Sequence, residues 1–79
     1  MANAIEKDTV SQHVRAELSE AAATYKAVWL AGHRDELEAR STYLATVIAL
    51  HAMSERLGLD VDFDPYWRVL GETRTRPSR

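Results

Sequence analysis

The 79-residue chain contains no cysteine, and this absence excludes disulfide bridges and metal sites built from thiolates. A chain of this length usually depends on disulfides, a metal, oligomerisation or very regular helix packing for its stability. Apolar residues make up 46% of the chain and charged residues 28%, a balance that is typical of a globular protein. We therefore expect one small domain that side-chain packing holds together.

Glycine is scarce and long apolar runs are missing. The three glycines are far apart, so no glycine-rich loop of the kind that binds phosphate is present. No apolar run approaches about 18 residues, which predicts that no segment spans a membrane. The first ten residues, MANAIEKDTV, lack the apolar stretch of a signal peptide. Because cysteine-free chains also fit a reducing compartment, we expect a cytoplasmic protein.

Charge is distributed unevenly, although the formal net charge is only −2. Residues 1–72 carry seven lysines and arginines against twelve acidic residues, whereas residues 73–79, TRTRPSR, carry three arginines and no acid. An acidic body is a poor surface for nucleic acid. We therefore divide the chain into one domain over residues 1–72 and a basic tail over residues 73–79, which we expect to be mobile.

Helical periodicity is present in two long segments. In the first, apolar residues recur at steps of three and four from Val10 to Trp29, and the run ends at Gly32. Three side chains near its start are candidate N-caps: Asp8, Thr9 and Ser11. The second segment ends at Gly58. A broad and mostly apolar face is formed by Leu37, Tyr43, Leu44, Val47, Ile48, Leu50, His51 and Leu57.

The two apolar faces differ in phase by roughly 90° when they are projected on one continuous helix. A single helix would keep the faces aligned, and Gly32 stands at the joint between them. The sequence therefore predicts two helices that are joined by a short turn, in an antiparallel helical hairpin.

The stretch LGLDVDFDPYWRVLGE, residues 57–72, admits three interpretations. Its aspartates resemble the start of a calcium loop, but Pro65 stands where such a loop needs glycine and Gly71 stands where it needs glutamate. A helix-turn-helix arrangement would place Asp64, Pro65 and Tyr66 against the DNA, where a negative charge has the wrong sign. Both interpretations are therefore disfavoured.

The third interpretation is a clasp that packs on the hairpin. Leu59, Val61 and Phe63 alternate with three aspartates, which is typical of an extended strap with one buried face. Asp64 as N-cap and Pro65 at the first helical position then predict a short third helix that Gly71 ends. We expect three of its side chains to pack on the hairpin: Phe63, Trp67 and Leu70.

Residue types that occur in catalytic and metal sites are present, but their spacing in the sequence forms no recognisable site. His51 lies among apolar residues and is interpreted as a histidine at the edge of the core. His13 and Glu17 are one turn apart, but two residues do not make a metal site. No strand–turn–helix elbow positions a nucleophile. We therefore expect a protein that is not an enzyme and that binds no cofactor or metal.

Aromatic residues are the stronger indication of function, because tyrosine and tryptophan occur in interfaces as well as in cores. We predict an all-α, non-enzymatic interaction or regulatory protein that binds another protein, as a homodimer whose two hairpins form a four-helix arrangement. The predicted partner-binding residues are Trp29, Tyr66, Trp67, Arg68, Arg74 and Arg76. One alternative is a nucleic-acid-binding dimer that uses the arginine tail, and another is a small helical enzyme whose site lies between protomers.

Overall fold

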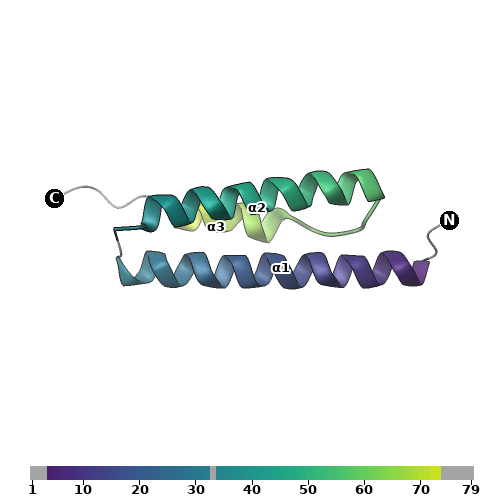
Figure 1. Cartoon of the computed structure of the whole chain (residues 1–79), viewed down its shortest axis with the longest axis horizontal. Helices are drawn as coiled ribbons and strands as arrows, with labels where there is room; N and C mark the ends of the chain where they lie inside the picture. Colours follow the sequence, from purple (N-terminus) through teal and green to yellow (C-terminus); the bar gives the residue numbers. More distant parts are fainter. Residues whose placement is uncertain (1–3, 33, 74–79) are drawn as a thin grey trace.

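The computed structural model describes residues 4–32 and 34–73, and this part of the chain forms three helices and no strand. They are α1 (Ala4–Ala31), α2 (Glu36–Leu57) and α3 (Asp64–Glu72). α1 and α2 run antiparallel and pack side by side, and α3 lies on one face of this pair, behind it in Figure 1. The predicted all-α class and helical hairpin are confirmed. None of the described helices is long and apolar enough to cross a membrane.

Two glycines end the long helices, as their positions predict. Gly32 has φ 65° and Gly58 has φ 66°, in the left-handed region that costs glycine little. At the end of α2, the Gly58 N–H donates to the Glu55 carbonyl, and the next N–H donates to the Ser54 carbonyl at 2.8 Å. These two bonds are the Schellman pattern, which satisfies carbonyls that the helix leaves open.

The start of α1 differs from the sequence prediction. The helix begins at Ala4, so the predicted N-caps Asp8, Thr9 and Ser11 lie inside it. The preceding residues include alanine, glutamate and lysine, which favour helix, and Glu6 in the first turn interacts well with the helix dipole. Ser11 is buried, which shows that it contributes to packing rather than to capping.

The core runs along the line where the three helices meet. Its buried apolar members are Val14, Leu18, Ala22, Tyr25, Tyr43, Val47, Phe63 and Val69. The rings of Tyr25 and Tyr43 stack at a centroid distance of 5.3 Å and an interplanar angle of 14°, which joins α1 to α2. Ser54 is also buried, and its hydroxyl has no hydrogen-bond partner among the described residues.

The strap before α3 packs as predicted. Phe63 is buried, Leu59 and Val61 are half-buried, and the aspartates that alternate with them are exposed. Arg15 of α1 holds the strap, because its Nη2 atom donates to the Asp60 carbonyl at 2.9 Å.

The bounds of α3 are displaced from the predicted ones. Asp64 is the first helical residue rather than the N-cap, because the Phe63 carbonyl accepts from Tyr66 and Trp67 and so opens the helix. Asp62 supplies the side-chain acceptor instead, at 3.0 Å from the Asp64 nitrogen. At the other end, the helix continues past Gly71 to Glu72, so the prediction that Gly71 ends it is wrong.

Candidate functional site

The two broad faces of the hairpin are covered unequally. On one face, Ser19 of α1 lies 3.4 Å from the Tyr66 hydroxyl, and Arg40 of α2 donates to the end of α3. Thr24 and Thr46 lie about 120–140° further around the two helices, at 100° per residue, and therefore face the opposite side. A groove opens there, and every residue that lines it comes from α1, from α2 or from the turn between them.

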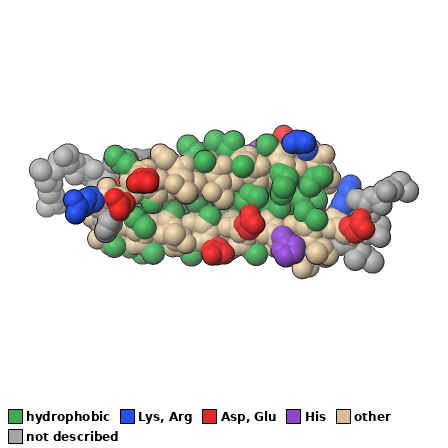
Figure 2. All heavy atoms as spheres, in the orientation of Figure 1, with side chains coloured by type: hydrophobic (Ala, Val, Ile, Leu, Met, Phe, Trp, Pro, Cys, Tyr) green, Lys and Arg blue, Asp and Glu red, His purple; other side chains and the backbone are tan. Residues whose placement is uncertain are grey.

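The groove combines small side chains with an acidic rim. It encloses roughly 630 Å³, and its lining includes Ala21, Thr24, Ala39, Thr42 and Thr46. Its four charged residues are all acidic: Glu17, Glu20, Asp35 and Glu38. Figure 2 views the molecule from this side and shows acidic side chains on both long helices, whereas the lysine and arginine side chains in view lie near the two ends. The groove is therefore a region of negative potential with an apolar floor.

Tyr25 and Tyr43 form the floor of this groove and separate it from α3. Their hydroxyl groups are hydrogen-bonded to α3 and the residue after it, because Tyr25 donates to the Thr73 carbonyl at 3.2 Å and Tyr43 donates to the Tyr66 carbonyl at 2.8 Å. Burial, together with the neighbouring Tyr66 and Tyr25, raises the pKa of Tyr43 to about 12. Both rings are thus held in place, and the floor is pre-formed.

Arg40 completes this network from α2. Its Nη1 atom donates to the Tyr25 hydroxyl at 2.9 Å and to the Thr73 carbonyl at 2.7 Å, and its Nη2 atom donates to the Leu70 carbonyl at 2.8 Å. A guanidinium group suits this position, since it presents several donors in a fixed plane at the negative end of a helix. The spacing of residues along the second helix carries no indication of this tertiary role of Arg40.

Three of the residues that the sequence predicted to bind a partner lie together on α3. Tyr66 and Trp67 are half-buried and pack against the core, while Arg68 is exposed. Trp67 meets the His51 ring edge-on at a centroid distance of 6.2 Å. These aromatic rings therefore hold α3 on the hairpin, and each keeps part of its surface accessible.

The other predicted residues lie elsewhere. Trp29 is half-buried near the end of α1. It follows Ser19, the α1 residue that contacts Tyr66, by ten positions or about 15 Å of helix. Arg74 and Arg76 lie outside the described residues. The structure therefore brings together only the α3 members of the predicted set.

A second surface is an apolar stripe on α2. Leu37, Leu44 and Ile48 are 62%, 38% and 52% exposed, although the sequence placed them on the same broad face as the buried Tyr43 and Val47. The stripe is turned about 100° from the buried residues around the helix axis. Figure 2 shows apolar side chains along the corresponding edge of α2. The broad face is thus divided into a core half and a half that neither α1 nor α3 covers.

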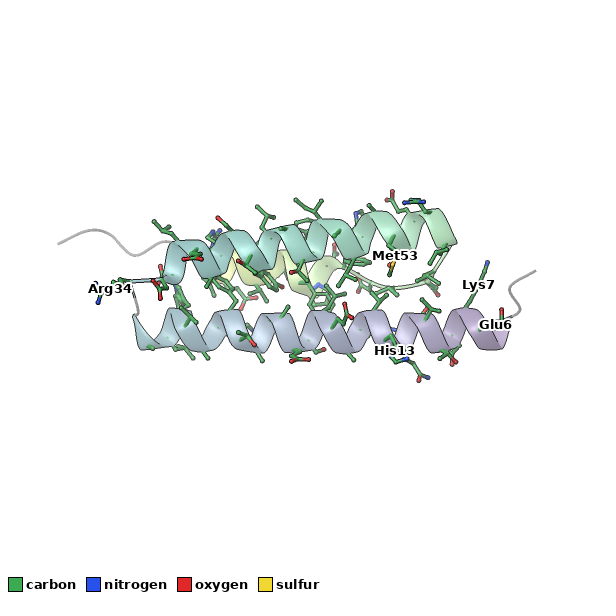
Figure 3. All side chains as sticks on the ribbon, in the orientation of Figure 1. Glu6, Lys7, His13, Arg34 and Met53 are labelled. Carbon is green, nitrogen blue, oxygen red and sulfur yellow. The ribbon has the colours of Figure 1, made fainter. Side chains whose placement is uncertain are left out.

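His51 has a partner that the sequence analysis overlooked. Its Nε2 atom lies 3.4 Å from Glu55 Oε1, and its ring meets Phe63 edge-on at 4.8 Å. The i,i+4 spacing of His51 and Glu55 is the feature of the sequence that indicates this pair. His51 is half-buried, in agreement with the interpretation as a core-edge histidine. His13 points away from the hairpin (Figure 3). Within residues 4–32 and 34–73, no three His, Asp or Glu side chains are grouped to hold a metal ion.

Comparison with known proteins identifies no relative. No protein-family model matches the chain, and neither a curated protein nor a solved structure is significantly similar to it. Two surfaces remain uncovered by the described part of the chain, the apolar stripe (Leu37, Leu44, Ile48) and the acidic groove.

Proposed function

We propose that this chain is a non-enzymatic interaction protein that acts by binding other proteins, and that it forms a homodimer through the apolar stripe of α2. The observation that supports this proposal is the exposure of Leu37, Leu44 and Ile48, each more than a third exposed and all on one line of the helix. An apolar line of this kind on a small helical protein is typical of a contact surface.

The stripe is better suited to self-association than the groove is. The exposed residues that flank it, Ser41 and Ala45, are small and uncharged, so two α2 helices can approach closely. Pairing two grooves would instead bring eight carboxylates together, and this repulsion opposes association at neutral pH. In the proposed dimer, two antiparallel α2 helices lie in the centre and the α1 helices outside, which gives four long helices.

The experiment is the solution mass by light scattering over a concentration series from about 10 μM to about 1 mM, a range suited to a small apolar interface. We expect the native chain to approach the mass of a dimer within this series. The variant Ile48→Lys places a charge within the stripe and should remain monomeric. Circular dichroism of the same samples checks that the variant keeps its helices.

Leu30→Lys is the matched control. Leu30 is the most exposed of the large apolar side chains, at 69%, but it lies on α1 and not on the stripe. The control introduces the same charge and should associate as the native chain does. A native chain that stays monomeric at the highest concentration would contradict the proposed dimer. Equal loss of association in both variants would show that the interface lies elsewhere.

A further inference from the structure

The acidic groove has a shape and charge that select its occupant. We propose that it binds an amphipathic helix of a partner protein, with a narrow apolar ridge and lysine or arginine on both flanks. This inference rests on the proposed role as an interaction protein, and it names the class of partner and the surface that receives it.

The floor of the groove fits a helix. Along α1 the lining extends from Glu17 to Tyr25, about 12 Å or slightly more than two helical turns. The side chains at one-turn spacing, Ala21 beside Thr24 and Thr42 beside Thr46, are short, so a third helix can approach to ordinary interaxial distances. The stacked tyrosine pair, each ring only 2% exposed, supports these small side chains from beneath and keeps the centre of the groove rigid.

The rim determines the charge of the occupant. Glu17, Glu20 and Glu38 are exposed, and they stand on the two opposite walls of the groove, two on α1 and one on α2. A helix lying between the walls would carry basic residues on each flank to meet them. Among the residues that the structure describes, no lysine or arginine lines the groove, and Arg34 extends from the turn end of the hairpin (Figure 3). Charge complementarity therefore favours a basic helix.

Two other occupants, a second copy of this chain and its own C-terminal arginine segment, fit the groove less well than a foreign helix does. A second copy of this chain would bring the same acidic rim against the first. The arginine segment at positions 74–79 of this chain, RTRPSR, has the right charge but contains no large apolar side chain to cover the tyrosine floor. A foreign helix supplies both the charge and the apolar ridge. Binding of such helices in grooves is a recurring mode of peptide recognition.

The test uses a synthetic 18-residue helical peptide with an alanine and leucine ridge and lysine on both flanks, added to the full-length chain labelled for NMR. We expect the largest amide shifts at Ala21, Thr24, Ala39 and Thr42. A second peptide with the same ridge and glutamate flanks should not bind. Shifts that centre on Trp67 and Arg68 would place the binding surface on α3 and overturn the proposal, as would an absence of shifts at millimolar lysine peptide.

Two matched triple variants test whether the acidic residues of the rim are responsible for binding. Glu17→Gln, Glu20→Gln and Glu38→Gln together should weaken binding of the lysine peptide about tenfold, as expected for three partly screened charge contacts. Asp8→Asn, Asp60→Asn and Glu72→Gln remove the same number of charges at exposed positions outside the groove, and this control should bind as the native chain does. Equal weakening in both triple variants would show unspecific attraction and overturn the proposal.

Further measurements separate this inference from the dimer and from the rival occupants. A monomeric chain whose groove shifts with the lysine peptide would refute only the dimer, and a dimer whose groove is unaffected would refute only the groove inference. If the groove resonances move on dilution of the chain alone, a second copy occupies the groove. If they move when residues 74–79 are deleted, the chain's own arginine segment occupies it. Either result overturns the proposed partner helix.

Discussion

Arg40 joins the three helices through one guanidinium group. It belongs to α2, and it donates to a tyrosine hydroxyl of α1 and to two carbonyls at the end of α3. Hydrogen bonds from a charged donor to partly buried acceptors contribute more than neutral ones, and the loss of Arg40 removes such a donor from both carbonyls. Arg40 is therefore a polar anchor of α3, beside the apolar packing of Phe63 and Val69.

Arg40→Lys should lower the free energy of unfolding by about 2 kcal/mol, because one ammonium group cannot reach all the acceptors of the planar fork. Urea unfolding followed by circular dichroism measures this loss. Arg68→Lys is the matched control, since Arg68 is exposed on α3, and it should change stability by less than about 0.5 kcal/mol. If the two variants unfold alike, the network around Arg40 is not a source of stability.

The raised pKa of Tyr43 predicts that the folded chain loses stability at high pH. Its pKa is raised to about 12 in the folded chain, against an ordinary value near 10 in the unfolded chain. Below pH 10 the Tyr43 hydroxyl keeps its proton in both the folded and the unfolded state, so its full contribution to the free energy of unfolding is present. From pH 10 to 12 the unfolded tyrosine ionises first, and the free energy of unfolding should fall by up to about 1.4 kcal/mol per pH unit.

The slope of stability against pH between 10 and 12 is the quantity to measure, in the native chain and in Tyr43→Phe. The phenylalanine variant loses the hydrogen bond to the Tyr66 carbonyl and starts less stable by about 1 kcal/mol. Its slope should nevertheless be shallower, because other groups that titrate contribute equally to both proteins. Parallel slopes would mean that Tyr43 ionises as readily in the folded state as in the unfolded state.

At the scale of the elements, α3 is a short helix that is anchored at both ends in addition to the packing of its apolar face. Phe63 is buried at its start, and Thr73, which the sequence analysis counted with the tail, is only 3% exposed at its end. The Thr73 carbonyl accepts from Tyr25 and Arg40, and its N–H donates to the Val69 carbonyl at 2.9 Å. Thr73 therefore packs with the body of the protein.

Two truncations that differ by one residue test this anchoring. A chain that ends at Thr73 should keep its stability to within about 0.5 kcal/mol, since all the contacts described above remain. A chain that ends at Glu72 should lose about 2 kcal/mol, because the Thr73 carbonyl that accepts from both Arg40 and Tyr25 is removed. Thermal unfolding distinguishes the two. Equal stability of both truncated chains would show that Thr73 contributes nothing.

At the scale of the whole molecule, the hairpin has more apolar surface than its own third helix covers. α3 closes one face, and the stripe on α2 remains outside that contact. If two copies associate through the stripe, folding and association are linked, and stability depends on concentration. The melting temperature of the native chain should then rise by a few degrees for each tenfold increase in concentration. Ile48→Lys should melt at one temperature throughout, and a native chain that does the same would argue against the dimer.

The sequence by itself determined the helices, the turn at Gly32 and the clasp. These features depend on local rules: apolar spacing along the chain, the left-handed conformation of two glycines, and the alternation of Leu59, Val61 and Phe63 with aspartates. The ends of α1 and α3 differ from the predicted ends because helix propensity and packing also act locally. Neighbouring residues continue a helix past a candidate cap when their propensity and packing allow it.

Only the tertiary structure decided which half of each apolar face became core. Tyr43 and Leu44 are adjacent in the sequence and equally apolar in pattern, yet one is buried against α1 and the other is 38% exposed. The positions of α1 and α3 made this choice, because Tyr43 stacks on Tyr25 of α1 and donates to the Tyr66 carbonyl of α3, whereas Leu44 faces away from both helices. Burial depends on which elements meet in space, and periodicity along one helix carries no information about its neighbours.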